Sequence, residues 1–258
     1  MDAGTSHIDT TTDLPRAGFW RRWLATIIDM IVVIVPFQVV AAILFAVTVG
    51  GVQMNSGLFT SCAPATTVPK ALDPPPPHDS NFATNCHVSF FGATTGATLI
   101  VGRTTREGTT TTTVRQGYML DAEGKPINGT SLDWIVQLAF LGYLIGMVWK
   151  TGRTVGARIV GVRVVNAAQP ATPGVPLDKA FIRYLAMAIG VVPVFAVLIY
   201  QRIAVGGSAD AMFTSGFFHW FMATGGLAAL WTLVLIVQIA RKQDPVYDRL
   251  AGTAVLRN

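Results

Sequence analysis

The chain has 258 residues, of which 51% are hydrophobic and only 13% are charged. Soluble domains carry about 25% charged residues, so this composition argues against a soluble protein and predicts a membrane protein. The net charge of +5 fits attraction to a lipid bilayer with anionic headgroups, and we expect no nucleic-acid partner because no soluble basic module is visible.

The apolar stretches predict an all-α polytopic membrane protein with about four transmembrane helices. The expected spans are 16–49, 132–149, 184–200 and 217–240. A span needs about 17–25 residues, so the two middle stretches are short. Three spans are the alternative, because Pro193 interrupts the third stretch, which would then only dip into the membrane. The first stretch is too long for the core of a cleaved signal peptide, so we expect an uncleaved helix.

Basic residues predict the orientation of these spans. Most of the 19 Lys and Arg residues fall in or beside three segments, 16–22, 150–183 and 241–258, whereas the short external loop 201–216 contains only Arg202. Cytoplasmic loops carry the excess of Lys and Arg. The sequence therefore predicts a multi-pass protein of the plasma membrane with both termini in the cytoplasm. The polar residues 1–15 are expected to form a disordered cytoplasmic N-terminus.

Residues 50–131 are expected to form an inserted extracytoplasmic region that contains short β-strands. Its apolar and polar residues alternate in short runs separated by glycines, which favours a small array of β-hairpins. The runs are Val88–Phe91, Thr98–Val101, Thr109–Val114 and Gln116–Leu120. The segment 121–124, Asp-Ala-Glu-Gly, is expected to form the last turn.

Both cysteines of the chain, Cys62 and Cys86, lie in this exported region, where a disulfide between them is the natural interpretation. Two free thiols or a metal site are the alternatives. A metal site would need more ligands than His78 and His87 supply, so no metal and no cofactor are expected.

The first span contains an acidic residue, Asp29. A charged carboxylate at the centre of a membrane costs roughly 2.5–3.5 kcal/mol, so it must reach the interface, take up a proton or meet a partner. Arg22 lies seven positions earlier, near the same helical face, and is the expected partner. Asp248, in the C-terminal segment 241–258, can reach back to the cytoplasmic lip where Arg22 begins the span.

The basic cytoplasmic interfacial loop 150–183 is the most patterned segment outside the spans. Its interleaved apolar and basic residues predict a short interfacial helix that runs into a strand. A Pro-rich turn should follow over 166–176, and the chain should re-enter the membrane with Arg183 at the lip. Neither glycine-rich phosphate-binding pattern is present.

Three segments together resemble the RDD family of bacterial integral membrane proteins, which is named for one arginine and two aspartates. The first runs from Arg22 to Asp29 and is similar to R-x-x-A-x-x-x-D. The second resembles G-x-T-x-G-[KR]-x-x-x-G and contains Gly152, Thr154, Gly156, Arg158 and Gly161, followed by Arg183. The third is similar to D-x-x-A-G-T-x-V and contains Asp248, Gly252 and Thr253.

The chain departs from the family pattern at two positions. Ala157 stands where a basic residue is frequent, with Arg158 beside it, and Tyr247 stands where histidine is common. The second departure removes any role that an imidazole would have. The resemblance covers the expected membrane core but not residues 50–131.

The resemblance implies an ion or small-solute transport role, with Arg22, Asp29 and Asp248 as the named trio. The leading hypothesis is a transporter or a component of a cation/proton antiporter that uses the intramembrane Asp29. The alternative is a non-transporting membrane scaffold or accessory protein whose Arg/Asp cluster is structural. No enzyme is expected, because no metalloprotease or serine-nucleophile motif occurs. Four helices with short loops supply few carrier-sized cavities, so a homo-oligomer is also considered.

Overall fold

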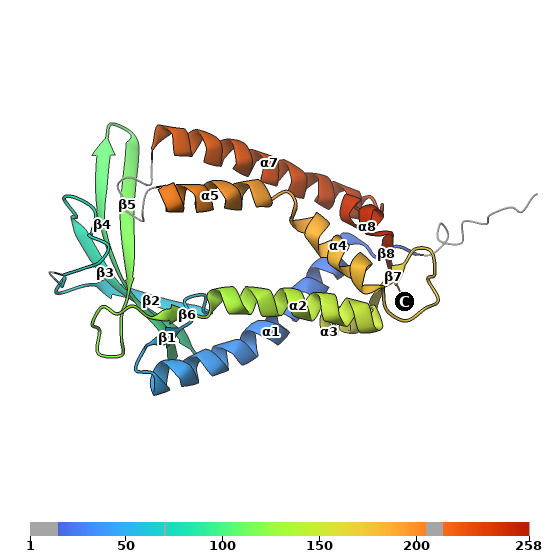
Figure 1. Cartoon of the computed structure of the whole chain (residues 1–258), viewed down its shortest axis with the longest axis horizontal. Coiled ribbons are helices and arrows are strands. Elements are labelled where there is room, and N and C mark those ends of the chain that lie inside the picture. Colours follow the sequence, from blue (N-terminus) through green and yellow to red (C-terminus); the bar gives the residue numbers. More distant parts are fainter. Residues whose placement is uncertain (1–14, 70, 205–213, 258) are drawn as a thin grey trace, which may run out of the picture. The chain divides into compact units, whose positions relative to one another are not determined.

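The computed structural model describes residues 15–69, 71–204 and 214–257. Within them the chain forms seven helices (Figure 1), namely α1 (Phe19–Val47), α2 (Asp133–Thr151), α3 (Val155–Ile159), α4 (Leu177–Ala188), α5 (Val192–Ala204), α7 (Ser215–Ala240) and α8 (Val246–Ala251). Two predicted segments lie mostly outside the described residues. They are the N-terminal segment 1–15, of which only residue 15 is described, and the loop 201–216, of which residues 205–213 are not described.

The described residues form eight strands in three separate sheets. The strands are β1 (Val52–Gln53), β2 (Phe59–Pro64), β3 (Phe82–Phe90), β4 (Ala93–Glu107), β5 (Thr110–Met119), β6 (Thr130–Ser131), β7 (Val162–Asn166) and β8 (Thr253–Arg257). β1 pairs with β6, β2 to β5 form one antiparallel sheet in sequence order, and β7 pairs with β8. The fold is therefore not purely all-α.

The chain divides into two compact units, which are described separately. The first unit comprises residues 1–32, 139–193 and 226–258, and the second comprises 33–138 and 194–225. The three long helices α1, α2 and α7 each contribute residues to both units.

Three helices are long and apolar enough to cross a membrane: Phe19–Val47, Asp133–Thr151 and Gly216–Ala240. They correspond to the first, second and fourth expected spans. The third expected span, 184–200, is wrong as a single helix, because the chain forms α4 and α5 with a bend of 68° between them. The described chain thus has three such helices, or four if the bent pair is one broken span.

The sequence explains the bend between α4 and α5. Pro193 lies in the first turn of α5, and a proline ring clashes with the carbonyl of the residue four positions earlier, here Ile189. Gly190 lies so close to Trp231 of α7 that an added Cβ would be 2.3 Å from the indole ring. The break therefore lies where a proline starts a new helix and a glycine permits a close contact.

In the first unit, segments from both ends of the chain pack together. β7 and β8 are antiparallel, with Val162 opposite Arg257 and Asn166 opposite Thr253. The Ala17 N–H donates to the Val255 carbonyl at 3.0 Å, just before α1 begins. A buried core joins the three segments; it contains Ala17, Val148, Ala157, Val162, Val164, Val175, Ala180 and Val255. The expected short helix, strand and turn are all present in residues 150–183, and α4 begins at Leu177.

In the second unit, the sheet β2–β5 packs on the C-terminal end of α1. Phe45 of α1 lies in one buried cluster with Ala97, Leu99, Val101, Tyr118 and Leu120. The strands are longer than the predicted runs, and β4 and β5 form a hairpin that continues to Gly108. The predicted last turn is confirmed, because the Gly124 N–H donates to the Asp121 carbonyl at 3.1 Å.

A disulfide joins Cys62 on β2 to Cys86 on β3, where the two residues lie directly opposite each other. All six residues of β2 are exposed, so little apolar burial holds this edge strand. We expect the double change Cys62→Ser, Cys86→Ser to lower the free energy of unfolding of the second unit by about 3 kcal/mol. Amide hydrogen exchange in β2 measures this loss, and it should be faster in the double variant than in the native protein. Reductant should produce the same change in the native protein and none in the double variant; unchanged exchange in both would contradict the prediction.

Candidate functional site

The Asp29 carboxylate is 2% exposed and accepts three hydrogen bonds in the first unit. The Tyr143 hydroxyl donates to Oδ1 at 2.8 Å, the Gly156 N–H donates to Oδ1 at 2.8 Å, and the Thr154 hydroxyl donates to Oδ2 at 2.5 Å. All three donors are uncharged. The expected pairing of Asp29 with Arg22 is therefore wrong: Arg22 turns away, to Asp248 at 3.1 Å.

The short helix α3 explains why these donors meet Asp29. The first N–H groups of a helix have no partner within the helix. Thr154 is the N-cap of α3, and its hydroxyl accepts from the Ala157 N–H at 3.1 Å while donating to Asp29. The Val155 N–H donates to the Tyr143 hydroxyl at 2.9 Å. The beginning of α3 is thus attached to α1 and α2 by one carboxylate and one phenol.

Gly156 brings α3 against the backbone of α1. An added Cβ would lie 2.1 Å from the Ala25 carbonyl oxygen and 3.0 Å from the Asp29 carboxyl carbon. Only a residue without a side chain allows this approach. Thr154 and Gly156 of the signature loop therefore hold Asp29 directly, a role that the sequence did not assign to them.

Asp248 is fully buried and forms ion pairs with two arginines. Arg22 Nη1 lies 3.1 Å from Oδ2, and Arg183 Nη1 contacts Oδ1. The Thr253 hydroxyl donates to Oδ1 at 2.9 Å. The predicted approach of Asp248 to Arg22 is confirmed, and Arg183, expected at the lip of the membrane, lies in the same cluster. We call Arg22, Arg183 and Asp248 the arginine–aspartate cluster.

Tyr247 lies beside this cluster at the position where the family commonly has histidine. Its ring centroid is 5.2 Å from the Arg183 guanidinium carbon, within cation–π range, and its hydroxyl lies 3.5 Å from Arg22 Nη1. Burial, and then the negative charge of Asp248, raise the pKa of the Tyr247 phenol above its usual value of 10.0. The phenol stays neutral at physiological pH, so it adds no negative charge to the cluster.

The remaining signature residues have backbone roles or lie at the surface. Gly152 and Gly161 adopt positive φ angles of 66° and 67°, after α2 and before β7 respectively. Gly252 ends α8 in the left-handed conformation. Arg158 lies exposed in the last turn of α3. The disulfide residues belong to the second unit.

A cavity of about 260 Å³ lies between Asp29 and the arginine–aspartate cluster. Its polar lining comes from Arg22, Asp29, Arg183 and nearby hydroxyl-bearing residues. Its walls are otherwise apolar and include Ala25, Met30, Phe140, Leu144, Val148 and Met187. The two charged features of the first unit therefore face one cavity.

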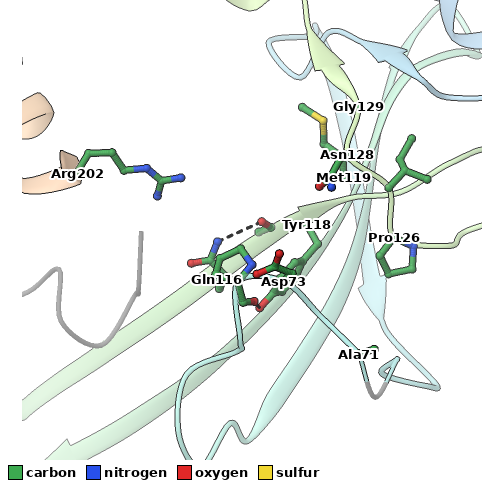
Figure 2. A pocket seen from close by; sticks show the side chains of 12 residues that line it. Ala71, Asp73, Gln116, Tyr118, Met119, Pro126, Asn128, Gly129 and Arg202 are labelled. Carbon is green, nitrogen blue, oxygen red and sulfur yellow. Dashed lines mark hydrogen bonds between the residues drawn. The ribbon is translucent and has the colours of Figure 1, made fainter. Parts of the chain in front are cut away.

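A second cavity, of about 370 Å³, lies in the second unit (Figure 2). It is lined by residues around β5, including Asp73, Gln116, Tyr118 and Asn128, and by Arg202, which lies apart from them. The Tyr118 hydroxyl donates to the Pro74 carbonyl at 2.8 Å, and burial, followed by Asp73, raises its pKa. No signature residue lines this cavity. Among the described residues, no group of three or more His, Cys, Asp or Glu side chains could hold a metal ion.

The apolar helices and the buried Arg and Asp side chains define an integral membrane protein of the polytopic class. The chain belongs to the RDD family, whose profile matches residues 16–252. The match extends across the insertion and the first two signature segments, and it covers the third segment as far as Gly252. Searches of curated proteins and of solved structures give no match.

Proposed function

We propose that this RDD protein is a component of a membrane transport system in which Asp29 binds and releases a proton or a cation. The observation that supports this function is a buried carboxylate that has only uncharged hydrogen-bond partners and lines a cavity. Ionisable residues inside membrane spans are rare and mark ion or proton pathways. We also propose a plasma-membrane location with cytoplasmic termini, as the basic residues predict, and a lipid surface with anionic headgroups as a partner.

Protonation of Asp29 would change how α3 is held. The ionised carboxylate accepts from all three donors, whereas a protonated oxygen becomes a donor itself. A proton on Oδ1 would face the donors of Tyr143 and Gly156. A proton on Oδ2 would face Thr154, whose hydroxyl already accepts from the Ala157 N–H at 3.1 Å.

The Gly156 N–H cannot turn into an acceptor, so a proton on Oδ1 removes its hydrogen bond to Asp29 and weakens the attachment of α3 to α1. A site whose proton affinity depends on the position of a neighbouring segment is the minimum that a coupled carrier requires. In this mechanism, α3 is attached to α1 when Asp29 is ionised, and α3 is released when Asp29 is protonated.

The test is cation flux driven by a pH gradient in sealed proteoliposomes. We expect Asp29→Asn to abolish the flux while the protein remains assembled, because asparagine cannot exchange a proton. Asp133→Asn is the matched control: Asp133 accepts hydrogen bonds from the Ser56 N–H at 2.9 Å and the Asn55 N–H at 3.2 Å, in the second unit. Flux that persists in Asp29→Asn would disprove the proposal.

The second candidate function is a membrane scaffold or accessory protein. It is favoured by the complete burial of Asp248 between two arginines, which ties the start of α1 to α8 and β8. In this function the charged cluster only holds the ends of the chain together, and residues 50–131 are the part presented to partners. It predicts that Asp29→Asn reduces the amount of assembled protein and that no flux occurs in the native protein.

A further inference from the structure

Arg183 has a hydrogen-bond donor that is buried without a partner. Its side chain is 9% exposed, and Nη1 contacts Asp248 and, at 3.3 Å, the Thr253 hydroxyl. Its Nε–H makes no hydrogen bond among the described residues, although Arg183 lines the 260 Å³ cavity. Leaving a charged donor unsatisfied in a buried position is costly, so an acceptor that enters this cavity would gain its full hydrogen bond.

The charges of the arginine–aspartate cluster, on the Arg183 side of the cavity, favour an anion with a single charge. Two guanidinium groups face one carboxylate in the arginine–aspartate cluster, which leaves one positive charge uncompensated. Tyr247 does not neutralise it, because its phenol is protonated. Asp29 accepts from three uncharged donors and keeps its negative charge, so an anion would bind beside Arg183 and away from Asp29. A phosphate dianion would require more positive charge and more hydrogen-bond donors than the arginine–aspartate cluster supplies.

The size and the walls of the cavity define the rest of the ligand. Most of the lining is apolar, from Met30, Phe140, Leu144, Val148 and Met187. An apolar cavity of 150 Å³ holds one benzene molecule, so by proportion this cavity holds a compact ligand of about ten non-hydrogen atoms.

We infer that the cavity binds a small organic monoanion, a carboxylate with a compact apolar body, and that its carboxylate accepts a hydrogen bond from Arg183 Nε. The inference deepens the proposed function, because it names the class of solute that the same cavity would take. Binding itself needs neither a pH gradient nor proton exchange at Asp29.

Binding is tested on the full chain in nanodiscs of zwitterionic lipid by calorimetric titration with benzoate. Benzamide is the neutral ligand of the same shape. We expect saturable binding of benzoate and at least about tenfold weaker binding of benzamide. Arg183→Gln should weaken benzoate binding by about tenfold to hundredfold, the range for a hydrogen bond to a charged group, and leave benzamide nearly unchanged.

A second variant keeps the test independent of the cluster. Leu144→Trp adds bulk to the cavity wall without changing any charge, and it should weaken both ligands. Absence of benzoate binding in the native protein, equal binding of benzoate and benzamide, or benzoate binding unaffected by both variants would overturn the inference. Suppression of benzoate binding by anionic lipid in the nanodisc would assign the site to a lipid headgroup and would also overturn it.

The two proposals fail in distinguishable ways. If benzoate binds as expected but native proteoliposomes show no pH-driven flux, the transport function fails and the ligand assignment stands. If flux occurs and depends on Asp29 but benzoate does not bind, only the ligand assignment fails.

Discussion

Replacing Asp248 by asparagine is expected to lower the free energy of unfolding by about 3–5 kcal/mol, the usual loss when one partner of a buried ion pair is removed. Asp248 is fully buried, and the side chains of Arg22 and Arg183 are 11% and 9% exposed. The substitution leaves two positive charges together without an anion. Thermal unfolding in detergent and the amount of assembled membrane protein measure the loss.

The matched control is Asp178→Asn, an exposed aspartate in the first turn of α4. Because exposed charges contribute little, its effect should stay below about 1 kcal/mol. The double change Asp248→Asn, Arg183→Gln should recover part of the loss, because it removes one of the two unpaired charges. If Asp248→Asn were no more destabilising than the control, the cluster would not hold the two ends of the chain together.

Gly156→Ala is expected to destabilise the first unit by about 1–3 kcal/mol through overpacking alone. The added Cβ would lie 2.1 Å from the Ala25 carbonyl oxygen, and this atom belongs to the backbone of α1 and cannot rotate away. The required shift of α3 also lengthens the 2.8 Å hydrogen bond from the Gly156 N–H to Asp29. Thermal unfolding measures the stability, and the flux assay shows whether the attachment of α3 affects Asp29.

The control for Gly156→Ala is the same change at Gly146 in α2, where an added Cβ meets nothing within 4 Å. Alanine is preferred over glycine inside a helix, so Gly146→Ala should stabilise by roughly 0.5–1 kcal/mol. Opposite signs at the two glycines are the expected result. Equal effects at both positions would contradict a close contact between α3 and the backbone of α1.

The interpretation of the charges from the sequence selected Asp29 and Asp248, which are both buried, and it was wrong about one pairing. Helical periodicity placed Arg22 and Asp29 near one face, and a charge in a membrane needs a partner. Periodicity cannot show that Tyr143, Thr154 and Gly156 reach Asp29 first, because these residues come from other segments. Tyr143 could have been selected from the sequence, because its hydroxyl is a polar group inside a predicted span.

The membrane spans also combine features that the sequence predicts with features that depend on tertiary contacts. Long apolar runs predicted α1, α2 and α7 well, because a helix that crosses a bilayer needs only length and composition. The third run failed as a single helix. Pro193 pointed to the break, but the 68° bend also depends on the contact of Gly190 with Trp231, which lies 41 positions along the chain.

Composition, apolar runs and short motifs were thus enough to identify a membrane protein of the RDD family, its main helices, its inserted strands and its cysteine pair. These properties depend on residue type and on neighbours in the chain. Other features depend on contacts between residues that lie from 65 to 226 positions apart in the chain. They are the β7–β8 sheet, the three uncharged donors at Asp29, the two arginines at Asp248 and the cavity between them. Several polar residues could have paired with each buried charge. Which of them does so depends on how the segments pack, and the local sequence does not determine that packing.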